Sequence, residues 1–225
     1  MSPGSEPGRT QPSGWRAAGA KATTTLLLRH GQTALSAERR FAGRGDYPLT
    51  DLGRQQAAAA GARLAERGGI DLIVSSPLVR ALATAQAVAD CTGAGLVTEE
   101  GLVETDFGSW EGMTFGEIRA NWPEQMNAWL ADAEVAPPGG ESFAAVGERV
   151  SAALDRLLRA YEGQTLVVVS HVTPIKTIVC RALLAPAAAL FRMHLDIASL
   201  TQAEWFADGP ALLRSLNDTT HLRSG

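Results

Sequence analysis

Short apolar runs alternate with alanine-rich segments along most of this chain of 225 residues. The run TLVVVS at 165–170 has the β-branched, apolar composition of a buried strand, whereas the segment 51–67 is alanine-rich and has Thr50 in place to cap a helix. Strands that alternate with helices form a mostly parallel sheet that helices cover on both faces. The alternation therefore predicts an α/β fold.

The other elements follow from the same patterns. We expect further strands at 24–28, 71–75 and 95–99, helices at 77–91, 115–131, 143–161 and 174–184, and two late strands at 199–206 and 211–216. The helix at 77–91 would begin with Pro77, since proline is favourable in a first turn. The two late strands flank Asp208 and Gly209, which predicts a hairpin and an antiparallel edge to the sheet.

The composition changes at both ends of the chain. Residues 1–22 include ten Pro, Gly and Ser residues, and such a segment is too poor in apolar side chains to order itself, so we expect a flexible linker or tail. Residues 218–225 are expected to form a loose tail. Residues 23–217 then make one domain, long enough to bury a sizeable core.

Charge and cysteine usage exclude several classes of protein. The formal net charge of -4 argues against a nucleic-acid-binding surface, which needs an excess of basic residues. The two cysteines, Cys91 and Cys180, form no CxxC pair, so a disulfide framework or structural zinc site is not expected, and a reducing cytoplasm suits them. No apolar run approaches the roughly 18 residues that a membrane span requires, so we expect no membrane partner.

Polar side chains follow three of the expected strands at the point where each strand ends. They are Arg29 and His30, then Ser75 and Ser76 with Arg80 one turn later, and finally Ser170 and His171. Ligands of open α/β sheets collect at the carboxyl ends of the strands, near helix amino termini. Two arginines and two histidines at one edge of an acidic protein predict a local positive pocket that suits a phosphate monoester.

The available nucleophiles narrow the chemistry. A cysteine phosphatase needs an arginine six residues after its cysteine, but Val97 follows Cys91 and Pro186 follows Cys180 at that spacing. The chain has no GxxxxGK[ST] loop, no DxD aspartate after a strand and too few histidines for a two-metal site. The remaining candidate is the imidazole of His30, which can attack phosphorus directly.

Five blocks in order carry a resemblance to a known family. They are RHG at 29–31, GRGDYPLTDLG at 43–53, SSPLVRALATA at 75–85, LVETDFGSWEG at 102–112 and SHVTPIK at 170–176. In these blocks the chain resembles the histidine phosphatase superfamily, also called phosphoglycerate mutase-like. The resemblance implies a three-layer α/β/α sandwich around a mostly parallel sheet, and an enzyme that needs neither a metal nor a cofactor.

The resemblance also implies roles for particular residues. His30 is expected to be the nucleophile that becomes phosphohistidine, Arg29, Arg80 and His171 to bind the phosphoryl oxygens, and Glu104 to donate a proton to the leaving group. Spacing alone does not choose among Glu104, Asp106 and Glu111; the family motif chooses Glu104, and the other two are expected to brace the loop.

Some positions depart from the family pattern. Ser36 stands where members often carry asparagine, and Gln32 where many carry glutamate, so Ser36 offers phosphate a hydroxyl with a shorter reach. Thr33 and Thr173 can donate hydroxyls to phosphate or bond locally in turns. We predict that Ser36 and Thr173 belong to the phosphate site.

The choice between mutase and phosphatase depends on cations beyond the first phosphate site. Segment 112–140 supplies one cation, Arg119, among acidic residues, which favours hydrolysis of a monophosphate over a cofactor-dependent phosphoglycerate mutase. A non-catalytic phosphate sensor is the remaining alternative, and a placed acid such as Glu104 argues against it. The apolar residues of the same segment should mostly pack in the core, with the rest forming a lid.

Longer stretches are similar to the phosphatase half of actinobacterial bifunctional ribonuclease H/acid phosphatase proteins, and through them to α-ribazole phosphatases. This likeness implies a fused or neighbouring ribonuclease H domain, with residues 1–22 as the linker, and no RNA cleavage by this chain itself. Ribazole phosphate, phosphoglycerate, sugar phosphates and phosphoserine all remain candidate substrates.

Overall fold

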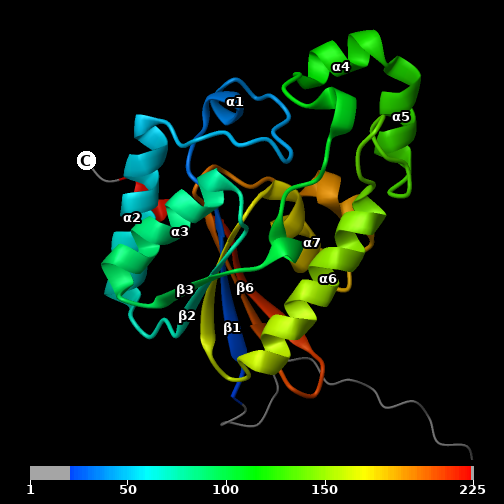
Figure 1. Cartoon of the computed structure of the whole chain (residues 1–225). Coiled ribbons are helices and arrows are strands. Elements are labelled where there is room, and N and C mark those ends of the chain that lie inside the picture. Colours follow the sequence, from blue (N-terminus) through cyan, green and yellow to red (C-terminus); the bar gives the residue numbers. More distant parts are fainter. Residues whose placement is uncertain (1–20, 224–225) are drawn as a thin grey trace, which may run out of the picture.

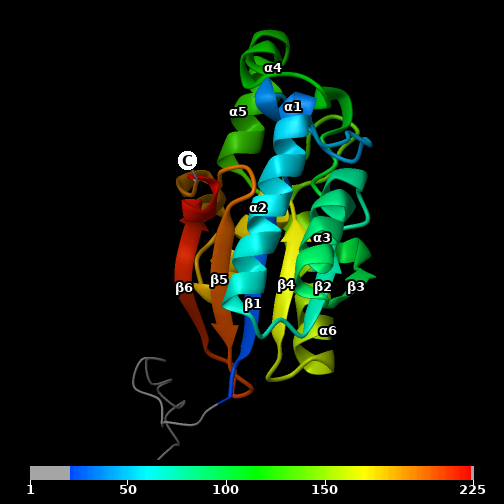
Figure 2. The ribbon, with the colours of Figure 1, turned by 90° about the vertical axis from the view of Figure 1, so that its left-hand side faces the viewer.

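A computed structural model describes residues 21–223 and contains a six-stranded sheet (Figures 1 and 2). The strands are β1 (Thr23–Arg29), β2 (Leu72–Ser75), β3 (Gly95–Thr98), β4 (Thr165–Ser170), β5 (Leu200–Trp205) and β6 (Ala211–Asp218). Their order across the sheet is β3-β2-β4-β1-β5-β6. The predicted α/β class and every predicted strand are confirmed, with small shifts at the ends of most of them.

The sheet is parallel on one side of β1 and antiparallel on the other. On one side, β1 pairs in parallel with β4, β4 with β2, and β2 with β3. On the other side, β5 pairs antiparallel with β1 and with β6, and β5 and β6 form the predicted hairpin. The carboxyl ends of β1, β4 and β2 therefore meet at one edge, where Arg29 is in register with Ser170.

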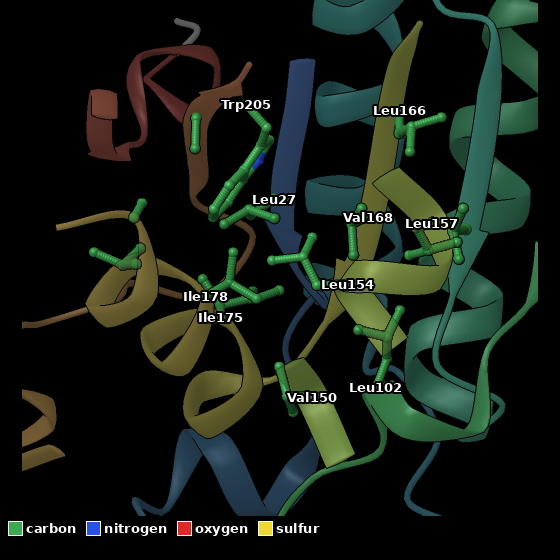
Figure 3. Packing of buried hydrophobic residues seen from close by; sticks show 14 of the residues in the cluster. Leu27, Leu102, Val150, Leu154, Leu157, Leu166, Val168, Ile175, Ile178 and Trp205 are labelled. Atoms are coloured by element: carbon green, nitrogen blue, oxygen red, sulfur yellow. The ribbon is translucent and has the colours of Figure 1, made fainter. Parts of the chain in front are cut away.

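Helices cover both faces of the sheet, as Figure 2 shows. Helices α2 (Asp51–Arg67) and α3 (Val79–Thr92) pack on one face, and α6 (Phe143–Ala160) and α7 (Val172–Ala182) pack on the other. Alternate side chains of β4 enter the two cores, since Val167 and Val169 face α2 and α3 while Leu166 and Val168 face α6 and α7. Figure 3 shows Val168 beside Leu154 of α6 in the second core. The predicted three-layer arrangement is confirmed.

A third apolar cluster lies beyond the edge of the sheet. It includes Trp110 of η3 (Gly108–Trp110), residues of α4 (Phe115–Asn121) and α5 (Pro123–Ala131), and Leu190 of η4 (Ala187–Arg192). The single helix predicted at 115–131 is wrong, because α4 ends at Asn121 and α5 begins at Pro123. Proline has no amide hydrogen to continue a helix and disfavours helical backbone in the residue before it.

Other boundaries also differ from the sequence prediction. α3 begins at Val79 rather than Pro77, and α7 begins at Val172 rather than Pro174. Short elements without a predicted counterpart are α1 (Ala34–Ala37) and η2 (Glu100–Leu102). The structure confirms Thr50 as the cap of α2, because its side chain accepts a hydrogen bond from Gly53 N.

The structure describes much of the predicted C-terminal tail but almost none of the predicted N-terminal one. Residues 1–20 and 224–225 lie outside the described residues, so the expected linker at 1–22 is almost entirely untested, and the division at 23 and 217 stays a prediction. Within the predicted C-terminal tail, however, β6 continues to Asp218 and η5 (Thr220–Leu222) follows, with His221 buried against the backbone of Ala198. Among the described residues, no helix combines the length and apolarity that a transmembrane span requires.

Candidate active site

Three strand ends and their following turns bring the predicted site residues to one edge of the sheet. Arg29 ends β1 and His30 follows it, while Ser170 ends β4 and His171 caps α7. Backbone bonds lock this edge, because His30 N donates to Ser170 O (3.1 Å) and Ser76 N donates to Val169 O (2.9 Å). In Figure 1 this edge lies below α1 and the α4 and α5 helices.

The His30 ring is held in one tautomer. Its Nδ1 lies 2.8 Å from Gly31 O, and a carbonyl oxygen only accepts, so Nδ1 carries the proton. Burial, and then the charges of Arg29 and Arg80, hold the pKa of His30 well below its usual range, so the ring is neutral at pH 7. Nε2 therefore bears a free lone pair and can act as a nucleophile.

His171 lies beside His30 at the same edge of the sheet. The two ring centroids are 5.1 Å apart. His171 Nε2 is 2.8 Å from Ser76 Oγ, which also accepts a weak bond from Leu78 N and so can give its own proton to the ring. Burial and the charge of Arg80 also hold the pKa of His171 well below its usual range. When Ser76 Oγ donates to Nε2, the neutral ring carries its proton on Nδ1, which is buried and has no partner among the described residues.

Two arginines, Arg29 and Arg80, supply positive charge at this edge. Arg29 Nη1 donates to Leu195 O (2.6 Å), and burial lowers the pKa of Arg29 to about 10 against the opposing charges of Glu104 and Asp196, so the group stays cationic. Arg80 is fully buried and donates to Gly43 O (2.6 Å) and to Gly45 O (2.9 Å). The Nε atoms of both arginines are buried and have no partner among the described residues.

Glu104 is buried beside the amino terminus of α7. Its carboxylate accepts from Thr105 N (2.8 Å) and from Thr173 N (3.3 Å). The other two acids of this loop have bracing contacts, as predicted. Asp106 accepts from Gly108 N (2.9 Å), and Glu111 accepts from Gly43 N (2.9 Å).

A cavity of about 1120 Å³ opens at this edge. Five of the seven predicted site residues line it, namely Arg29, His30, Ser36, Glu104 and Thr173, while Arg80 and His171 do not line it and lie beside His30. Ser36 Oγ is occupied locally, since it donates to Thr33 O (3.0 Å) and accepts from Thr33 N (2.8 Å). The phosphate-binding role of Ser36 stays a prediction, and this local bonding weighs against it.

The rest of the cavity wall is mixed in character. The third apolar cluster contributes Phe107, Trp129, Leu130, Phe143 and Leu190 to an apolar side of the cavity, which Phe115 and Phe191 extend. Of the segment predicted to divide between core and lid, Met126 and Trp129 are buried, whereas Phe115 is 42% exposed.

The sequence analysis missed several charged wall residues. Arg39, Lys176, His194, Asp196 and Arg223 all line the cavity. Lys176 lies one turn after Thr173 in the SHVTPIK block, and that spacing is the only sequence signal for it. The others come from loops and from the end of the described chain. In the described part of the chain, no group of three or more His, Cys, Asp or Glu side chains has a metal-binding arrangement.

Known proteins are similar to this chain over most of its length. The bifunctional protein Rv2228c of Mycobacterium tuberculosis is 50% identical over 209 residues, which are 93% of this chain but only 57% of that protein. A probable phosphoglycerate mutase, GpmB of Yersinia pestis, is 34% identical over 87% of this chain and 93% of its own length. The structure of mycobacterial glucosyl-3-phosphoglycerate phosphatase is 32% identical, with a TM-score of 0.80 over 88% of this chain and 100% of that one.

The family model described as the histidine phosphatase superfamily (branch 1) matches residues 25–219. That match includes all but the first two residues of the sheet and all five sequence blocks. This chain therefore belongs to the histidine phosphatase superfamily.

Proposed function

We propose that this chain hydrolyses a small phosphomonoester through a phosphohistidine formed at His30. The observation that carries the proposal is the tautomer of His30, because Nδ1 bonded to Gly31 O leaves the Nε2 lone pair for phosphorus. The unpartnered Nε atoms of Arg29 and Arg80 and the Nδ1 of His171 are suitable donors for phosphoryl oxygens.

The proposed reaction has two steps. In the first, His30 Nε2 bonds to phosphorus, the bond from phosphorus to the leaving oxygen breaks, and that oxygen takes a proton from the Glu104 carboxyl group. In the second, the Glu104 carboxylate removes a proton from water as the water oxygen attacks phosphorus. The bond from phosphorus to Nε2 then breaks, and inorganic phosphate and neutral His30 are released. Arg29, Arg80 and His171 stabilise the charge on the phosphoryl oxygens in both steps.

The cavity suggests the class of substrate. Its volume and its combination of apolar and charged walls suit a small metabolite that has an apolar or sugar-like part in addition to phosphate. The relative named glucosyl-3-phosphoglycerate phosphatase supports a phosphorylated metabolite of this size.

A phosphoglycerate mutase is the second candidate. A mutase must hold a second phosphate, and Arg39, Lys176 and Arg223 on the cavity wall supply cations that segment 112–140 lacks. Hydrolysis is preferred because Lys176 is engaged with Leu190 O (3.0 Å) and the facing wall is apolar. We expect interconversion of 2- and 3-phosphoglycerate, primed with the bisphosphate, to be negligible beside hydrolysis.

The test is a panel of phosphomonoesters assayed with a chelator present. We expect hydrolysis to persist, and protein quenched in an alkaline denaturant should carry phosphate that survives alkali and is released by acid. His30→Ala should lose both the turnover and the phosphoprotein. Loss of activity on chelation with recovery on adding a divalent ion would overturn the imidazole mechanism. Binding of phosphate esters without turnover or covalent phosphate would indicate a sensor.

The relative with a bifunctional name is longer than this chain. The chain spans 57% of the bifunctional relative, and we propose that a ribonuclease H domain is fused to it or acts beside it. Nuclease assays of the full-length gene product against an RNA/DNA hybrid test this. The cytoplasmic location stays a prediction, supported by the free state of Cys91 and Cys180.

A further inference from the structure

One guanidinium on α6 contacts most of the segment that leads to Glu104. Arg149 Nη1 donates to Gly101 O (2.9 Å) and to Val103 O (2.7 Å), and Nη2 donates to Glu104 O (3.0 Å). The side chain is 20% exposed. Because a guanidinium is planar and rigid, these three bonds fix the relative positions of three carbonyl groups.

Glu141 completes the arrangement from the other side. It pairs with Arg149 through two bonds, from Nε to Oε1 (2.7 Å) and from Nη2 to Oε2 (2.8 Å). The backbone of Glu141 also donates to Asp106 O (2.8 Å). The same ion pair therefore holds the backbone on both sides of the Glu104 side chain, at residues 101–104 and at Asp106.

The pair also reaches the loop that contacts Arg80. Arg44 donates to Glu141 Oε2 (3.3 Å), and its neighbours Gly43 and Gly45 accept from Arg80. Burial alone would raise the pKa of Glu141, but the bonds and charge of Arg149, together with the charge of Arg44, lower it, so Glu141 stays ionised. The ion pair thus links the backbone that carries Glu104 to the loop that contacts Arg80.

We propose that Arg149 and Glu141 are positioning residues that hold Glu104 in line with the leaving oxygen. This inference rests on the proposed function, since it gives Glu104 the role of general acid. Neither residue lines the cavity, so each acts through the backbone on which Glu104 is carried. A displacement of about 1 Å at such a group can cost roughly 100-fold in rate.

The test compares Arg149→Lys and Glu141→Gln with a matched control, Arg156→Lys. Arg156 lies two turns further along α6 and pairs with Glu99, but it contacts none of the carbonyls at 101–104. The readout is the first-turnover rate constant from rapid quenching, with an alkyl phosphate and with nitrophenyl phosphate. Circular dichroism and thermal unfolding report the fold of each variant.

Lysine keeps the charge but cannot bind three carbonyls as a planar fork. We expect Arg149→Lys to lower the first-turnover rate by about 10- to 100-fold on the alkyl ester and by less than about threefold on the aryl ester, whose phenolate leaves with little help. Glu141→Gln should act in the same direction. Inhibition by inorganic phosphate should not change, because the phosphate-binding side chains remain.

A double variant separates positioning from general damage. In a Glu104→Gln background, Arg149→Lys should have no further effect on the alkyl ester, since the group that it positions is already disabled. Equal losses on both esters, additive losses in the double variant, or an equal effect of Arg156→Lys would each overturn the inference. An inactive wild-type protein would instead refute the proposed function.

Discussion

At the scale of single residues, the hydrogen bonds of the Glu104 carboxyl group come from backbone amides, while the charges of Arg29, Arg80 and Lys176 lie near it. Its bonds come from Thr105 N and Thr173 N, and the group is 5% exposed. In the described part of the chain this carboxyl group accepts hydrogen bonds from backbone amides and forms no salt bridge, so it can exchange a proton with a substrate oxygen without first breaking one. This environment suits a group that donates a proton in one step and accepts one in the next.

Glu104→Gln tests that role directly. General-acid assistance is worth about 10²- to 10⁴-fold, and it matters most when the leaving oxygen is strongly basic. We therefore expect phosphorylation of His30 to slow far more with an alkyl phosphate than with nitrophenyl phosphate, measured as the first turnover by rapid quenching. If the two esters lose equally, Glu104 only shapes the pocket and the acid must be sought at Asp106 or Glu111.

At the scale of elements, the turn after β1 approaches α2 so closely that only glycine fits at the contact. A Cβ on Gly53 would overlap Gln32 O, and a Cβ on Gly31 would overlap Gly53 O. The turn after His30 is thus packed directly against the first turn of α2, which fixes the direction in which His30 leaves the strand.

Gly53→Ala should therefore destabilise the protein by about 1–3 kcal/mol through overpacking, and it should also lower kcat/KM because the backbone beside His30 must shift. Gly147→Ala is the control, since a Cβ there meets no atom within 4 Å and the residue lies inside α6. It should stabilise by about 0.5–1 kcal/mol and leave kcat/KM unchanged. Urea unfolding and steady-state assays check both; a neutral Gly53→Ala would show that the contact is not tight.

At the scale of the whole molecule, buried neutral histidines make stability depend on pH. Burial lowers the pKa of His30, His171 and His221 below the usual value of about 6.5. Below that pH these histidines bind protons in the unfolded chain but stay neutral in the folded chain, so the free energy of unfolding decreases as the pH falls.

The free energy of unfolding should therefore decrease from pH 7.5 to pH 5.5, by up to about 1.4 kcal/mol per pH unit for each fully buried histidine. Replacing His171 by glutamine should flatten this slope, whatever its effect on stability at pH 7.5. Urea titrations at several pH values measure both, and a wild-type curve that is level over this range would contradict the shifted pKa values.

Local sequence patterns were enough to predict the layers, the strands of the sheet and the edge of the sheet where the site residues lie. These depend on local properties: the β-branched run of β4, the cap at Thr50, and polar residues directly after strands such as His30. Pro123 also marks the division between α4 and α5 in the sequence, but the apolar periodicity across 115–131 favoured one continuous helix.

Which side chains contact one another depends on how the helices pack on the sheet. The contact of Arg149 with Glu104 joins residues 45 apart, the bond between Arg80 and Gly43 spans 37, and no periodicity encodes such pairs. Tertiary packing also placed Ser76 against the ring of His171, 95 residues away, and brought Lys176 and Asp196 to one cavity. Backbone propensity acts within a turn or a strand, whereas hydrogen-bond partners across the molecule exist only after the helices have packed on the sheet, and that is why the site's residue types were predictable and its supporting bonds were not.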